Sequence, residues 1–86
     1  MALNVLLVDD EYLVLKGLEI ILSEQTETSV KIVTAMDVED ALNKLTSFRP
    51  DVIITDINMP ESNGFELIKQ AQQNFPHCRF IICSGY

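Results

Sequence analysis

The chain has 86 residues, of which 48% are hydrophobic, and it carries a net charge of −7 with only six lysines and arginines. This length predicts one small domain, its apolar content excludes a disordered chain, and its few basic side chains argue against binding to the phosphates of a nucleic acid. Because neither a membrane-spanning run nor a secretory leader can be recognised, we expect a cytoplasmic protein without membrane contact.

Strand and helix patterns alternate along the chain. In order they are VLLV at 5–8, a helical pattern over 12–24, VKIVTA at 30–35, a helical pattern after Asp37, VIIT at 52–55, a helical pattern ended by Pro76, and FIIC at 80–83. Three of the strand runs are continuously apolar, which is typical of strands buried on both faces of a parallel sheet. The partial alternation of VKIVTA indicates an edge strand. This order predicts an α/β fold with a parallel sheet and right-handed crossovers.

The helical patterns contain apolar stripes that we expect to face the core. Asp37 is placed to cap the second helix, and Asn63 with Glu66 resembles a capping box for the third. The expected stripes are Val14, Leu18, Ile21 and Leu22; then Val38, Ala41, Leu42 and Leu45; then Phe65, Ile68, Ala71 and Phe75.

Polar residues follow the three apolar strands at the point where each strand ends: Asp9 with Asp10, Asp56, and Ser84. In an open parallel sheet the carboxyl ends of the strands meet at one edge, where ligands bind. Clustered carboxylates with open positions suit Mg²⁺. We therefore expect Asp9 and Asp10 to bind the metal, Asp56 to act as a nucleophile toward a phosphoryl group, and Ser84 to donate a hydrogen bond to it. The alternative for Asp9, Asp10 or Glu11 is a helix cap.

Two cysteines, Cys78 and Cys83, lie near the last strand and are expected to be reduced and partly buried. A metal site formed with His77 would lack a fourth ligand and the usual spacing, so we do not expect one.

The stretches "VLLVDDE", "PDVIITDINMPESNGFELI" and "FIICSGY" resemble the receiver domains of two-component response regulators, in the right order and over essentially the whole chain. The resemblance implies a flavodoxin-like, doubly wound sheet, a sensor histidine kinase as phosphoryl donor, and Asp56 as phosphoacceptor. It further implies Mg²⁺ held by Asp9, Asp10, Asp56 and the backbone carbonyl of Asn58, and Ser84 as the switch hydroxyl. The segments "LVDDEYLVLKGL" and "SGY" look most like those of receivers joined to AraC-type output domains. The protein would contact DNA only through such an output domain.

Receivers of this family continue through a fourth helix, a fifth strand that carries a lysine, and a fifth helix. Residues 1–86 are therefore expected to form a C-terminally incomplete receiver, with strand order 2-1-3-4 and the FIIC strand at an exposed edge. Such an edge predicts association with another copy, through edge pairing or exchanged elements.

Two other functions fit parts of the pattern. One is a Mg²⁺-dependent phosphatase, with Asp9 as nucleophile and Glu11 as acid, although the chain is short for a substrate pocket. The other is an interaction module that keeps the fold without phosphorylation. We favour the non-enzymatic phosphoacceptor.

Overall fold

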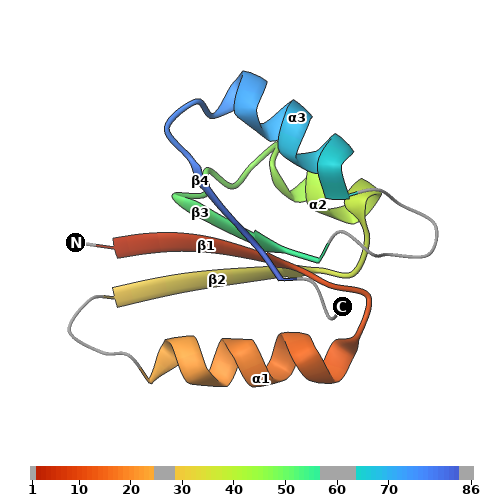
Figure 1. Ribbon diagram of the computed structural model, residues 1–86. Coiled ribbons are helices and arrows are strands. Elements are labelled where there is room, and N and C mark those ends of the chain that lie inside the picture. The colour runs from red at the N-terminus through yellow and green to blue at the C-terminus, as the bar shows by residue number, and fades with distance from the viewer. Residues whose placement is uncertain (1, 25–28, 57–63, 84–86) are drawn as a thin grey trace.

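The computed structural model describes residues 2–24, 29–56 and 64–83. Four parallel strands form one sheet in the order β2-β1-β3-β4, with α1 on one face and α2 and α3 on the other (Figure 1). The predicted fold class and strand order are confirmed. The elements are β1 (Ala2–Val8), α1 (Tyr12–Ser23), β2 (Ser29–Ala35), α2 (Val38–Lys44), β3 (Val52–Thr55), α3 (Gly64–Asn74) and β4 (Arg79–Ile82).

Strand β1 lies inside the sheet, paired with β2 on one side and with β3 on the other. Leu6 is in register with Val33 of β2 and with Ile53 of β3. Leu6 and Leu7 are completely buried, which explains why β1 is a continuous apolar run. The edge position predicted for VKIVTA is confirmed, since among the described residues β2 pairs only with β1.

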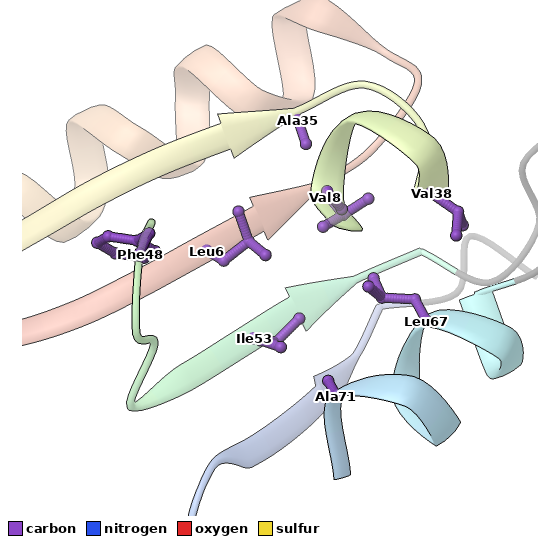
Figure 2. Packing of buried hydrophobic residues seen from close by; sticks show 9 residues of the cluster. Leu6, Val8, Ala35, Val38, Phe48, Ile53, Leu67 and Ala71 are labelled. Carbon is purple, nitrogen blue, oxygen red and sulfur yellow. The ribbon is translucent and has the colours of Figure 1, made fainter. Parts of the chain in front are cut away.

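The hydrophobic core has one layer on each face of the sheet. On the α2 and α3 face, Leu6 and Ile53 pack with Leu67 and Ala71 of α3 (Figure 2). On the α1 face, Val5, Leu7 and Leu15 form a smaller cluster. Successive side chains of a strand point to opposite faces, so each central strand contributes to both layers.

The predicted face of α1 is partly wrong. Leu15 is its one fully buried residue, and Leu18 and Leu22 pack beside it as expected. Val14 and Ile21, which we placed in the core, are exposed. Apolar residues occur on every side of this helix, so hydrophobicity alone did not identify the side that covers the sheet.

Helix α3 shows a similar shift of its apolar face. Ala71 is buried as predicted, but Phe65 is exposed and Leu67 takes the buried position. Ile68 and Phe75 are half-buried at the border. Pro76 lies two residues beyond the end of the helix, where a proline cannot continue it. The capping box stays a prediction because Asn63 lies outside the described residues.

Helix α2 agrees with the sequence analysis in both its cap and its buried face. The Asp37 carboxylate accepts a hydrogen bond from the Asp40 amide at 2.7 Å, and Val38 and Ala41 are buried. Leu42 and Leu45 pack against the same core.

Among the described residues, the last strand, β4, forms the second edge of the sheet, as expected. Ile81 and Ile82 are 49% and 47% exposed, although the continuous apolar run resembles that of a fully covered strand.

Both cysteines are free thiols. Cys78 is half-buried as predicted, whereas Cys83 is exposed. Within the described ranges, the structure contains no helix with both the length and the apolar character needed to cross a membrane.

Candidate metal centre

Asp9 and Asp56 come directly after the adjacent central strands β1 and β3. The Asp9 amide donates to the Ala35 carbonyl of β2 at 3.1 Å, and the Asp56 amide donates to the Val8 carbonyl of β1 at 3.0 Å. These backbone bonds extend the ladder of the sheet one residue past each strand. Both carboxylates are therefore carried on rigid backbone at the same edge of the sheet.

The Asp9 side chain is fixed as well as its backbone. Asp9 is only 8% exposed, and its Oδ1 accepts a hydrogen bond from the Glu11 amide at 2.9 Å. Glu11 itself occupies the N-cap position of α1, but its side chain forms no capping hydrogen bond. The capping role considered for Glu11 is therefore wrong. Asp9 organises this turn instead.

The three carboxylates meet as the sequence predicted. Asp9, Asp10 and Asp56 each offer an oxygen, and these oxygens all lie within 4.8 Å of one another. Asp10 and Asp56 are half-buried, so the cluster stays accessible from solvent. Carboxylates so close together repel unless a cation joins them.

The electrostatics of Asp9 reflect this crowding. Burial raises the pKa of the Asp9 carboxyl above its ordinary value of 3.8, against the opposing effect of the Glu11 amide. The charge of Asp56 and the hydrogen bond and charge of Asp10 raise this pKa further. The ionised form of Asp9 is therefore disfavoured by its own surroundings, and a divalent cation would relieve the repulsion.

The donor set fits a hard divalent cation such as Mg²⁺. Oxygen ligands from one or two carboxylates, with the remaining positions left to water and phosphate, are what Mg²⁺ prefers. The partial exposure of Asp10 and Asp56 leaves room for those further ligands. Asn58 and Ser84, the other two predicted site residues, lie outside the described residues.

Thr55 supports the backbone beside Asp56, and the sequence analysis missed this role. It is completely buried, and its hydroxyl donates to the Asp56 carbonyl at 3.1 Å. This bond helps to hold the backbone at the point where the chain leaves β3. The signal was a hydroxyl at the last position of an otherwise apolar run, which we treated only as a β-branched strand residue.

Comparison with known proteins completes the evidence for the family. The family model described as "Response regulator receiver domain" matches residues 5–86. The chain belongs to this family. The resemblance found in the sequence is thereby confirmed, and with it a place in two-component signalling, which works through phosphorylation.

Several relatives and solved structures resemble this receiver domain. It is 34% identical over 83 residues to the uncharacterized transcriptional regulatory protein YesN of Bacillus subtilis, covering 96% of this chain and 23% of YesN. TrrA from Thermotoga maritima, solved in complex with Mg²⁺-BeF, has a TM-score of 0.86 and 31% identity over 98% of this chain and 70% of that chain.

A two-component transcriptional regulator AraC from Clostridium phytofermentans has a TM-score of 0.87 and 33% identity, covering 98% of this chain and 68% of that chain. The receiver spans less than two fifths of the length of the first curated relatives that it matches.

Proposed function

We propose that this receiver accepts a phosphoryl group on Asp56 with Mg²⁺ bound at the adjacent carboxylates. The observation that carries the proposal is the cluster of Asp9, Asp10 and Asp56, whose oxygens lie within 4.8 Å of one another at the carboxyl ends of β1 and β3. Mg²⁺ would be held by these residues and by the backbone carbonyl of Asn58. When bound, it neutralises charge on the phosphoryl oxygens during transfer.

The roles of the carboxylates follow from their surroundings. A half-buried Asp56 can present one oxygen to an incoming phosphorus atom, while Asp9 is buried and already bound to the Glu11 amide. Asp56 forms an O–P bond as the bond from phosphorus to the donor histidine nitrogen breaks, and that nitrogen keeps the electron pair. The Ser84 hydroxyl is proposed to hydrogen-bond a phosphoryl oxygen afterwards.

The same contacts disfavour the phosphatase alternative. Its nucleophile would be Asp9, a residue that is 8% exposed and whose carboxylate is fixed by a hydrogen bond. A buried, hydrogen-bonded carboxylate is poorly placed to attack a phosphate ester from solvent. We therefore propose a non-enzymatic signalling role.

The proposed partners follow from the family. We infer a sensor histidine kinase as phosphoryl donor in the cytoplasm, and an output region of the AraC type as the element that meets DNA. The 33% identity to the Clostridium phytofermentans regulator supports this output type. With net charge −7, the receiver itself is a poor ligand for nucleic acid.

The test is phosphorylation by acetyl phosphate in the presence of Mg²⁺, followed by intact mass spectrometry. We expect the chain to gain one phosphoryl group, and Asp56→Asn to gain none. Asp51→Asn is the matched control, because Asp51 precedes the same strand at its opposite end, and this variant should still be labelled. Labelling of Asp56→Asn at the wild-type level would reject Asp56 as the acceptor.

A further inference from the structure

A groove lies between α2 and α3, near the amino end of the sheet. The two helices contact each other on the same face of the sheet (Figure 1). The groove has a volume of about 410 Å³, within the range of about 300–1,000 Å³ that is typical of ligand sites. This α2–α3 groove is lined chiefly by Leu42, Leu45, Arg49, Gln70, Asn74 and Phe75.

The α2–α3 groove does not depend on either edge of the sheet. Its walls are two described helices, which are packed on the core through the completely buried Ala41 and Ala71. Helix α2 contacts β2 and β1, on the side of the sheet away from β4. A strand or helix added beside β4 would therefore leave the groove between α2 and α3 in place.

Apolar side chains form the floor of the groove. Leu42 and Leu45 pack against the core and also line the groove. Phe75 is half-buried directly after α3, and its amide donates to the Ala71 carbonyl at 2.7 Å. Because the core holds these side chains in place, the floor is already formed and can receive an apolar side chain.

One cation, Arg49, stands beside this floor on rigid backbone. Arg49 lies between Phe48 and Pro50, which are both buried, and Phe48 packs with Leu6 in the core (Figure 2). The Arg49 carbonyl accepts a hydrogen bond from the Asn4 side chain at 3.1 Å. The Arg49 side chain itself is exposed. A cation carried on a fixed backbone loses less freedom when it binds a partner.

The charge of Arg49 is not compensated by its surroundings. The chain has 13 acidic and only six basic residues, yet no acidic residue is among the described residues that line the groove. Lys16 pairs with Glu19 at 3.4 Å and Lys44 with Asp40 at 3.6 Å, whereas the described residues show no ion pair at Arg49. The groove is therefore complementary to an anionic group.

A carboxylate is the anion that fits this arrangement. A guanidinium pairs with a carboxylate through two parallel hydrogen bonds, so one arginine is sufficient. A nucleic acid would need several clustered cations to neutralise its phosphates. In the described part of the chain, Arg49 is the one basic residue that lines the groove.

The α3 wall offers acceptors for a peptide backbone. Gln70 and Asn74 lie one helical turn apart on the same side of α3. The Gln70 side-chain amide donates to the Glu66 carboxylate at 3.0 Å, and the Asn74 side-chain amide donates to the Gln70 carbonyl at 3.2 Å. With these N–H groups used within the helix, the side-chain oxygens of both residues can accept backbone N–H groups of a bound segment.

We propose that the α2–α3 groove binds a peptide segment of a partner protein, in which a carboxylate lies close to an apolar side chain. The carboxylate pairs with Arg49, and the apolar side chain packs on Leu42 and Leu45. This inference goes beyond the proposed function. The groove lies at the opposite end of the sheet from Asp56, and a receiver that failed to accept phosphate would still bind the segment.

The first test is selection from a phage-displayed library of random peptides about twelve residues long. The 86-residue chain is the bait, and Arg49→Glu is used for counter-selection. We expect the enriched peptides to share an aspartate or glutamate within about four residues of a leucine, isoleucine, methionine or phenylalanine. Enrichment of peptides without an acidic residue, or no enrichment at all, would overturn the proposal.

The second test measures the contribution of Arg49 with one enriched peptide by isothermal titration calorimetry. Arg49→Glu should raise the dissociation constant by about tenfold or more, because it replaces attraction by repulsion. Lys69→Glu is the matched control, since it changes the net charge equally at an exposed position of α3 outside the lining. It should stay within about twofold of the wild type. Circular dichroism checks that both variants are folded. Equal losses in the two variants would show that net charge alone matters, and would contradict the pairing with Arg49.

The third test locates the peptide by NMR titration of the ¹⁵N-labelled chain. The largest shifts should fall on the residues that line the groove, and Asp56→Asn should bind the peptide as tightly as the wild type. Shifts centred on Asp9 and Asp56 instead would place the peptide at the carboxyl end and reject the groove. Sedimentation equilibrium of the chain alone examines the other occupant. Self-association that Arg49→Glu abolishes would assign the groove to a second copy and overturn the proposed partner.

Discussion

Aspartates lie at both ends of the sheet, but their surroundings at the two ends are opposite in kind. At the amino end, the Asp51 carboxylate accepts a hydrogen bond from the backbone amide of Asn4 at 2.8 Å, and the backbone amide of Asp51 donates to the backbone carbonyl of Asn4 at 2.7 Å. The side-chain amide of Asn4 also donates to the Arg49 carbonyl at 3.1 Å. At the carboxyl end, Asp9 faces two further carboxylates, and its burial together with their charges raises its pKa.

The aspartate at the amino end stabilises the fold, whereas the aspartates at the carboxyl end form the candidate metal site. A lone carboxylate that accepts backbone amides ties β1 to the start of β3 and strengthens the sheet. Carboxylates gathered within 4.8 Å destabilise the metal-free protein and persist where a bound cation compensates for them. The difference predicts that substitutions at the two ends have effects of opposite sign.

The largest expected effect is on metal binding. Mg²⁺ should stabilise the wild type, by about 1.4 kcal/mol at ten times its dissociation constant. Asp9→Asn and Asp10→Asn should each weaken Mg²⁺ binding by more than about tenfold, since each removes a charge from the ligand set. Thermal unfolding with and without Mg²⁺ measures both effects, and Asp51→Asn is the control at the other end. An unchanged response to Mg²⁺ in the Asp10→Asn protein would remove Asp10 from the site.

A smaller effect is expected at the amino end. Asp51→Ala removes the acceptor of the Asn4 backbone amide and should lower the free energy of unfolding by about 1 kcal/mol, because this hydrogen bond is exposed to solvent. Asp51→Asn keeps an oxygen at the same position and should lose less. Urea denaturation measures the difference. Equal losses in the two variants would show that the hydrogen bond is not what stabilises this end.

The smallest effect concerns pH in the absence of metal. Because the folded-state pKa of Asp9 lies above 3.8, the folded chain binds its proton more tightly than the unfolded chain. The free energy of unfolding should therefore fall as pH rises from about 3.8 to the raised pKa, and the contribution of Asp9 should be constant above it.

Asp9→Asn should remove this part of the pH dependence. It should also stabilise the metal-free protein at neutral pH by less than about 1 kcal/mol, because solvent screens charges at a partly open site. Denaturation at a series of pH values in a chelating buffer tests both statements. A loss of stability in Asp9→Asn at neutral pH would contradict the repulsion at the carboxyl end.

Much of the architecture was predictable because its signals are local. The runs at 5–8 and 52–55 are apolar without alternation, as covered parallel strands require, and Asp37 capped its helix as expected. The meeting of Asp9 and Asp56 also followed from the sequence, since parallel strands bring their carboxyl ends to one edge.

The buried faces of α1 and α3 were harder to predict because they depend on neighbours. Leu15 rather than Val14, and Leu67 rather than Phe65, contact the core, although all four are apolar. The position of each helix over the sheet selects among them. The role of Thr55 was also not evident in the sequence, because its hydrogen bond depends on where the chain leaves β3.

The sequence by itself determined the order of strands and helices, the acids at the strand ends and the membership of the receiver family, because these depend on residue type and spacing along the chain. Only the tertiary structure decided which apolar side chains are covered and how Asp9 is fixed by the Glu11 amide. Burial and hydrogen-bond direction are properties of several elements packed together, and no single segment contains them.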